Sequence, residues 1–293
     1  MGMGYTILYK SRLIGWLTHL CTGATRQFID MTLSRIVPVR AFADNYIWVI
    51  RNHVHAAVVD PGDAAPVLDY LRQEKLQLIA ILNTHHHHDH VGGNKILLRE
   101  FPVPVYAPAA ESIPDVTHPL HECADRESDD GIVYLREFAL SFRVLDIPGH
   151  TAGHIAYYGG NMLFCGDTLF ACGCGKLFEG TPVQMTASLQ KLADLPGDTQ
   201  VYCGHEYTLG NIRFARAVEP GNQELLKREQ TVEGLVKQRI PTLPSTIAQE
   251  KATNPFLRCQ QPEVIHSASG HANKTLNDPV AVFAALREWK NAF

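Results

Sequence analysis

Short apolar runs that end in turn residues recur along the chain as far as residue 205. Continuous apolar runs predict buried strands, and apolar residues spaced by three and four positions predict helices. The predicted strands cover residues 45–50, 55–60, 78–84, 103–107, 139–148, 154–160, 161–167 and 200–205. The predicted helices in this part cover residues 65–76, 94–101 and 182–196. This mixture indicates an α/β protein with two sheets covered by helices.

The pattern changes after Tyr207, where helical spacing dominates. Helices are predicted at residues 210–219, 223–238 and 279–293, with a proline-rich connector at 241–244. We therefore expect one domain at residues 31–205 and a smaller helical domain at 206–293. Residues 1–30 precede a second methionine, Met31, and carry three basic residues and one acidic residue. We interpret this segment as a disordered leader or an over-long start, with a targeting peptide as the alternative.

The charge distribution excludes some classes of partner. The formal net charge is −4; residues 31–205 carry 12 Lys and Arg against 20 Asp and Glu, and residues 206–293 carry 11 against 9. Without a basic field we expect no nucleic-acid partner. The chain has no run of 18 apolar residues, so we expect no membrane span. We expect a monomer.

The cysteines indicate a reducing compartment. Their number is seven and their spacing is irregular, which is typical of reduced thiols in an intracellular protein. We therefore expect a cytoplasmic location. The segment ACGCG at residues 171–175 indicates a tight glycine-rich turn rather than a redox or metal site.

The segment LNTHHHHDHVGGN, residues 82–94, holds the strongest chemical signal. It follows a buried-strand pattern, lies inside the chain and is interrupted by Asp89, so it is not a purification tag. In extended backbone His85 and His87 project to the same side. His86 and His88 then point away, and we interpret them as residues of a solvated loop.

Other predicted strands also end in side chains that can bind a metal. Sites in α/β proteins gather outside the carboxyl ends of strands, and the strands ending near 84, 148, 166 and 203 lead to His85, His150, Asp167 and His205. One metal needs three or four protein ligands. The candidates number seven, which suits two metals with a shared carboxylate: His85, His87, Asp89, His90, His150, Asp167 and His205. His154 we interpret as structural.

The motifs resemble those of a known family. THHHHDH, PGHTAGH, GDTLF and CGHEYT resemble the motifs of the metallo-β-lactamase superfamily. GCGKLFEGT, CGHEYTLGNIRFA, TNPFLR and ALREWK resemble glyoxalase II, the hydroxyacylglutathione hydrolases, over residues 31–293. The resemblance implies an αβ/βα sandwich of two mixed sheets with a C-terminal helical domain that helps to bind glutathione. It also implies a first metal held by His85, His87 and His150, a second held by Asp89, His90 and His205, and Asp167 as the bridge.

The resemblance also implies residues that bind the substrate. Lys176 and Tyr207 match residues that contact glutathione, and Phe178 stands where the family often has tyrosine. Arg287 and Lys290 match a basic pair that meets the glutathione carboxylates. From the residues alone, this pair shares a helix face, and a solvated basic face is the alternative.

The function implied is a thioester hydrolase that converts S-(R)-lactoylglutathione to glutathione and D-lactate, a step of methylglyoxal detoxification. Two divalent ions would hold a bridging hydroxide as the nucleophile. Asp89 and Asp167 would act as metal ligands at the reaction, and Cys165 and Cys203 need no catalytic role. Zinc suits these ligands, and iron or manganese would also be accepted.

The sequence leaves three alternatives to this function. A mononuclear iron oxygenase acting on glutathione persulfide would leave the second metal set empty, and the intact set of Asp89, His90 and His205 argues against it. A metallo-β-lactamase or a nuclease disagrees with the glutathione-type tail and the absence of a basic surface. A metal-binding module without catalysis would keep the ligands but lack activity.

Overall fold

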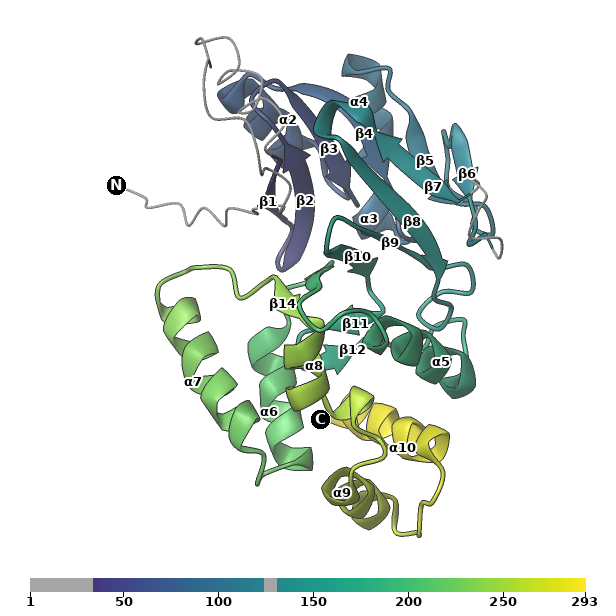
Figure 1. Ribbon diagram of the computed structural model, residues 1–293, viewed down its shortest axis with the longest axis vertical. Coiled ribbons are helices and arrows are strands. Elements are labelled where there is room, and N and C mark those ends of the chain that lie inside the picture. The colour runs from purple at the N-terminus through teal and green to yellow at the C-terminus, as the bar shows by residue number, and fades with distance from the viewer. Residues whose placement is uncertain (1–33, 124–130) are drawn as a thin grey trace, which may run out of the picture.

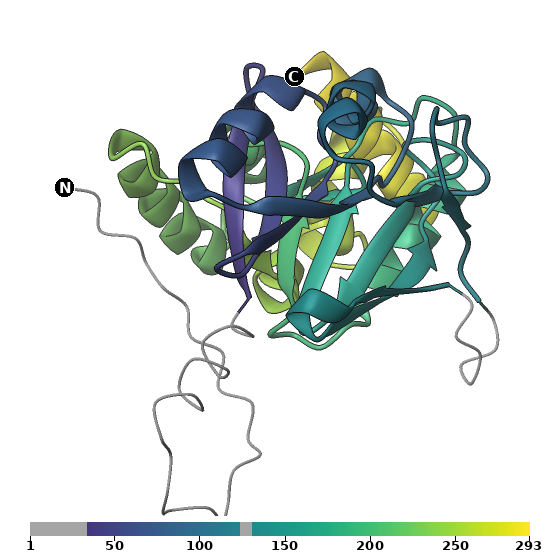
Figure 2. The ribbon, with the colours of Figure 1, turned by 90° about the horizontal axis from the view of Figure 1, so that it is seen from above.

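Two six-stranded sheets pack face to face, and helices lie outside them (Figures 1 and 2). The computed structural model describes residues 34–123 and 131–293. The predicted leader at residues 1–30 lies outside the described residues. The predicted sandwich of two mixed sheets is confirmed.

The first sheet has the order β1-β2-β3-β4-β5-β6. Its first three strands are antiparallel and the remaining neighbours are parallel. The strands are β1 (Arg35–Ala41), β2 (Asn45–Arg51), β3 (His55–Val59), β4 (Gln77–Leu82), β5 (Val105–Pro108) and β6 (His118–Leu120). Helices α2 (Ala64–Glu74) and α4 (Asn94–Glu100) cover one face through an apolar cluster that includes Val67, Leu71 and Leu97.

The second sheet has the order β14-β13-β10-β9-β8-β7. Its strands are β7 (Ile132–Leu135), β8 (Leu140–Asp146), β9 (Ile155–Gly159), β10 (Met162–Gly166), β13 (Gln200–Cys203) and β14 (Ser245–Thr246). The larger apolar cluster joins the two sheets and includes Trp48, Phe142 and Phe164. Helix α5 (Pro182–Ala193) contributes Met185 and Leu189 to the same cluster. A 3-10 turn, η1 (Arg136–Phe138), precedes β8.

The C-terminal helices gather at one end of the sandwich, in green and yellow in Figure 1. They are α6 (Thr208–Val218), α7 (Gln223–Lys237), α8 (Ile247–Thr253), α9 (Pro262–Ala272) and α10 (Pro279–Ala292), with a 3-10 turn η2 (Pro255–Leu257). Side-chain caps begin α7 at Asn222 and α10 at Asp278. The predicted helices α6, α7 and α10 are confirmed, whereas α8 and α9 were not predicted.

One strand of the second sheet comes from the helical part of the chain. β14 pairs with β13, so residues 206–293 are not purely helical. The division into domains at residue 205 stays a prediction.

A small hairpin lies between β10 and α5 in sequence. It consists of β11 (Leu169–Phe170) and β12 (Gly173–Cys174), and Cys172 turns the chain with φ 56°. This confirms the predicted turn at ACGCG. The cysteines of the described ranges, Cys123 among them, are all free thiols. In the described ranges, no helix has the length and apolarity needed to cross a membrane.

Candidate metal centre

Four strands bring the predicted side chains to one edge of the sandwich. β4 ends at Leu82, three residues before His85, and β8 ends at Asp146, four residues before His150. Asp167 directly follows β10, and His205 lies two residues after β13. The ends of β10 and β13 are joined by a hydrogen bond of 2.9 Å from Gly204 N to Gly166 O.

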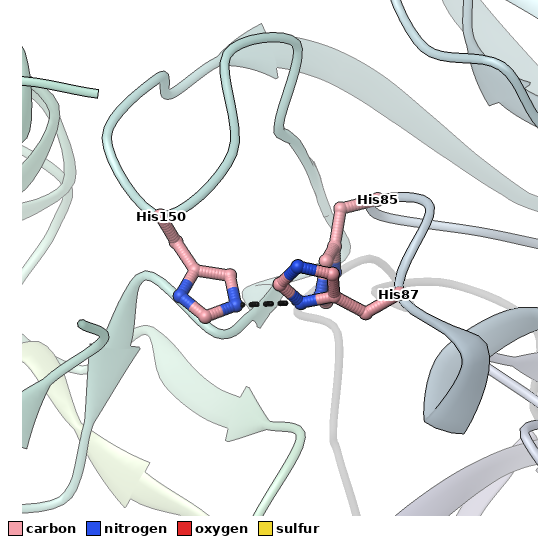
Figure 3. A group of neighbouring side chains, drawn as sticks. All are labelled: His85, His87 and His150. Carbon is pink, nitrogen blue, oxygen red and sulfur yellow. Dashed lines mark hydrogen bonds between the residues drawn. The ribbon is translucent and has the colours of Figure 1, made fainter. Parts of the chain in front are cut away.

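The first group consists of three histidines whose ring nitrogens converge. Nε2 of His85 lies 3.1 Å from Nδ1 of His87, and Nε2 of His150 lies 3.0 Å from the same Nδ1. Figure 3 shows the rings of His85 and His87, from one loop, pointing at the ring of His150 from another. Three imidazole nitrogens within 4.8 Å of one another could hold one metal ion.

The second group consists of Asp89, His90 and His205. Oδ2 of Asp89 lies 3.4 Å from Nε2 of His205 and 3.6 Å from Nε2 of His90. These ligand atoms also lie within 4.8 Å of one another, so the group could hold a second ion. His90 belongs to α3 (His88–Val91), a single turn that begins directly after His87.

Asp167 lies between the two groups. Its Oδ2 is 3.5 Å from Nε2 of His150 and 3.2 Å from Nε2 of His205, and its Oδ1 is 3.4 Å from Nε2 of His90. The one carboxylate therefore faces nitrogens of both groups.

Buried polar atoms at this centre lack partners within the described residues. Nε2 of His90 and Oδ1 of Asp167 are buried without a hydrogen bond. An unpaired buried polar atom costs about 1–3 kcal/mol, and a bound cation would satisfy both atoms. Imidazole and carboxylate ligands suit zinc, iron and manganese. The residues present fit divalent metal ions.

Further contacts orient the histidine rings. Nδ1 of His90 faces Oδ2 of Asp60 at 3.1 Å, and Nδ1 of His205 faces Oδ1 of Asp44 at 2.8 Å. Nδ1 of His150 donates to the carbonyl oxygen of Lys176 at 2.9 Å. Such partners fix the tautomer, so that Nε2 presents its lone pair to a metal.

Sequence reasoning missed some of these orienting residues. Asp44 and Asp60 were not predicted, nor was Asn45, whose Nδ2 donates to Oδ2 of Asp89 at 3.0 Å. A signal for Asp60 was present, because it directly follows β3 in the same way that Asp167 follows β10. The signal for Asp44 and Asn45 was weaker, since Asp44 precedes β2 and Asn45 is its first residue.

The two groups differ in electrostatics. Burial lowers the pKa of His85, His87 and His150 below the ordinary histidine value. Burial would also lower the pKa of His90, but Asp167 and Asp60 raise it well above that value. Protons therefore compete with a cation mainly at the second group.

The pKa of Asp167 follows from the same contacts. Burial would raise this pKa, but His90 and His205 hold it well below the ordinary aspartate value. Asp167 is therefore an ionised carboxylate over the neutral pH range and suits a cation.

Two of the predicted substrate residues flank the candidate metal ligands. The ring of Phe178 is 64% exposed and lies edge-on to His87 and His150, at 5.4 and 5.3 Å between centroids. The ring of Tyr207 stacks on His205 at 4.7 Å. These aromatic rings thus touch ligands of both groups, and their substrate roles stay predictions.

The basic residues have different surroundings. The side chain of Lys176 is exposed. Arg287 is buried, and its NH1 donates to the carbonyl oxygen of Cys174 at 2.8 Å. Nζ of Lys290 donates to Oδ1 of Asn211. The alternative of a solvated basic face is therefore wrong for Arg287.

Three further histidines were interpreted from the sequence. His88 is exposed, as expected. His86 is solvated only in part, because its side chain is 32% exposed and its Nδ1 donates to Oε2 of Glu111 at 2.8 Å. His154 has a structural contact, since its Nε2 accepts a hydrogen bond from Asp167 N at 3.2 Å and its ring stacks on His85.

Comparison with known proteins places the chain in a family. The family model "Metallo-beta-lactamase superfamily" matches residues 42–205, and "Hydroxyacylglutathione hydrolase C-terminus" matches residues 206–293. A hydroxyacylglutathione hydrolase of Nitrosomonas eutropha is 62% identical over 258 residues, which are 88% of this chain and 98% of the relative. The chain belongs to the hydroxyacylglutathione hydrolase family of the metallo-β-lactamase superfamily. This confirms the family predicted from the sequence, and with it the enzyme class of hydrolases.

Solved structures agree on the fold. The ETHE1 structure from Myxococcus xanthus covers 89% of this chain and 99% of its own, with a TM-score of 0.58 and 24% identity. The structure of TTHA1623 in a di-iron-bound form covers 75% of this chain and 100% of its own, with a TM-score of 0.52 and 26% identity. This chain thus shares its sandwich with more distant proteins.

Proposed function

We propose that this chain hydrolyses S-(R)-lactoylglutathione and related 2-hydroxyacylglutathiones to glutathione and a 2-hydroxy acid, D-lactate in the first case. This would make it a thioester hydrolase of methylglyoxal detoxification. The observation that carries the proposal is the convergence of side chains from four strand ends in a chain of this family. A monomeric state and a cytoplasmic location stay predictions.

Two divalent ions, most simply Zn²⁺, are proposed as cofactors. His85, His87 and His150 would hold the first ion, and Asp89, His90 and His205 the second. Asp167 would bridge them, because its two oxygens face nitrogens of both groups. When bound, the ions would supply a water made nucleophilic near neutral pH and would polarise the thioester carbonyl.

The residues of the chain supply position and electrostatics. Asn45 donates to Oδ2 of Asp89 and so fixes one carboxylate of the second group. Asp167, with its lowered pKa, stays ionised and adds negative charge between the histidines. No serine or cysteine nucleophile is needed, and burial raises the pKa of the Cys165 and Cys203 thiols, which keeps both protonated.

The leaving group needs little assistance. A thiol has a pKa of about 8.5, so its thiolate departs readily without a general acid. Phe178 and Tyr207 would frame the substrate above the metal ligands. Lys176, Arg287 and Lys290 would meet the charged glutathione part, which is an expectation from the family.

The test is hydrolysis of S-(R)-lactoylglutathione, followed at the thioester absorbance, together with metal analysis of the purified protein. Two ions per chain and release of free thiol are expected. Oxygen uptake with glutathione persulfide, without thioester hydrolysis, would overturn the proposal in favour of an oxygenase.

A further inference from the structure

A buried carboxylate lies beside the first group of histidines and takes no part in it. Glu111 follows β5, and its side chain is 2% exposed. Oε2 accepts a hydrogen bond from Nδ1 of His86 at 2.8 Å. Oε1 accepts from the hydroxyl of Thr151 and from Gly153 N, the latter at 3.2 Å. A buried carboxylate is costly unless its oxygens are bonded, and here both are.

A second carboxylate repeats the same arrangement on the other side of His86. Nε2 of His86 faces Oε1 of Glu179 at 3.4 Å, and Oε2 of Glu179 accepts from Ala152 N at 2.8 Å. Both carboxylates therefore join the ring of His86 to residues 151–153. We call Glu111, His86 and Glu179 the clamp.

The clamp connects the two loops that supply the first group. His86 stands between His85 and His87, and residues 151–153 directly follow His150. The clamp thus holds the loop of His85 and His87 against the loop of His150.

His87 is the ligand that depends most on this clamp. The outer nitrogens of His85 and His150 have partners, Oγ1 of Thr84 at 3.0 Å and the carbonyl oxygen of Lys176. Across residues 34–123 and 131–293, no hydrogen bond reaches Nε2 of His87. The position of its ring therefore rests on its edge-on contact with Phe178 and on its backbone. That backbone is held on one side by the α3 turn, since the His87 carbonyl oxygen accepts from His90 N at 2.9 Å, and on the other side by His86.

The close approach at residue 153 shows that the clamp requires a glycine there. A Cβ on Gly153 would lie 2.6 Å from Cγ of Glu111 and 2.9 Å from Cβ of Ala110. Any side chain at this position would push the carboxylate away from its donors.

We propose that Glu111 and His86 are positioning residues for the first metal group. They hold His87 and His150 at the mutual distance that lets both bind the same ion. This inference rests on the proposed function only in assuming that the group binds metal.

The experiment measures metal affinity, not turnover. A His205→Ala background removes a ligand of the second group, so that zinc titration against a chromophoric chelator reports the first group. In this background Glu111→Ala and His86→Ala should weaken zinc binding about 10- to 100-fold, the usual cost of losing a partner that orients a ligand. His88→Ala is the matched control, since it removes an exposed histidine from the same motif, and it should leave the affinity unchanged.

A conservative variant separates positioning from simple stability. Glu111→Gln keeps an oxygen for Thr151 and Gly153, so it should recover most of the affinity lost in Glu111→Ala. Thermal melting of the metal-free variants is measured in parallel. If Glu111→Ala and His86→Ala lower the melting temperature but bind zinc as tightly as the His88→Ala control, their role is structural only. That result would overturn the inference.

Failure of the two proposals is distinguishable. Absence of zinc binding in the unsubstituted chain would overturn the proposed function and this inference together. Zinc binding that is equally tight in the His205→Ala background and in both clamp variants made in it would overturn this inference alone.

Discussion

Asp60→Asn is the sharpest perturbation of the second metal group. The Asp60 side chain is 4% exposed, and its Oδ1 accepts from Thr84 N at 2.8 Å. Its Oδ2 accepts from the hydroxyl of Thr84 at 2.7 Å and faces Nδ1 of His90 at 3.1 Å. A carboxylate only accepts, so Nδ1 of a neutral His90 carries the proton and Nε2 is free for a metal. Asparagine has nearly the same shape and tolerates the φ of 53° at this position.

The expected loss of zinc affinity in Asp60→Asn follows from one reversed hydrogen bond. If the amide oxygen keeps the bond from Thr84 N, the amide nitrogen becomes a donor that faces Nδ1–H of His90. Either two donors, the amide N–H and Nδ1–H of His90, then face each other, or the His90 proton moves to Nε2. Nε2 is the atom proposed to bind the metal. A buried donor without a partner costs about 1–3 kcal/mol. Since 1.4 kcal/mol is a factor of ten, one zinc-binding step should weaken about 5- to 150-fold.

The assay is zinc titration of the metal-free protein against a chromophoric chelator. Asp44→Asn is the matched comparison, because Asp44 bonds His205 in the same way but its side chain is 38% exposed. Water can replace the lost acceptor there, so its effect should stay below about tenfold. An unchanged affinity in Asp60→Asn, or a larger loss in Asp44→Asn, would refute this reasoning.

Three other predictions use the same centre. Asp167→Ala should lower the metal content below that of the unsubstituted chain and abolish thioester hydrolysis, because Asp167 faces both groups; full content by elemental analysis would contradict this. Removing metal with a chelator should lower the melting temperature, because Nε2 of His90 is then buried and unpaired. Zinc at about 100 times its Kd should restore about 2.7 kcal/mol of stability, and identical melting curves with and without zinc would contradict this prediction. Burial and the nearby Arg287 lower the pKa of Lys290 to about 8, so its charge is lost as the pH rises through 8 and kcat/KM should fall above that pH. In Lys290→Arg this fall should move to higher pH, and an unchanged profile would exclude Lys290 as its cause.

The convergence of the candidate metal ligands could be predicted because each one follows an apolar run in the sequence, and because the ends of strands in a sandwich lie close together. His85, His150, Asp167 and His205 each follow an apolar run, and strand ends of a sandwich meet at one edge. The pair of His85 and His87 needed only the alternation of extended backbone, whereas Asp89 and His90 lie in the helical turn α3. The main strands were predictable for the same reason, since their apolar runs are continuous.

The features that could not be predicted from the sequence depend on which distant segments meet in the folded chain. Glu111 lies in a loop without any pattern, and its role exists only because His86 and Gly153 come to it in the folded chain. β14 has two residues, Ser245 and Thr246, which is too short for a periodic signal. Its hydrogen bonds to β13 are a tertiary property that no local pattern contains.

The C-terminal helices reach the centre through the β11–β12 hairpin. Oε2 of Glu250, a buried residue, accepts from Cys172 N at 2.8 Å at the turn of the hairpin. Arg287 donates to the carbonyl oxygen of Cys174 at its end. Helices α8 and α10 therefore fix the hairpin by bonds to its backbone.

The chain that leaves this hairpin serves the metal ligands and the substrate together. Two residues after Cys174, the carbonyl oxygen of Lys176 accepts the Nδ1 proton of His150 at 2.9 Å, while the Lys176 side chain stays exposed. A displacement of the hairpin would therefore change the ring orientation of His150 and the position of a residue expected to meet glutathione. This shared segment gives a physical reason why the helical part and the sandwich occur in one chain: a single backbone segment would set both the geometry of the proposed metal centre and the proposed substrate contact.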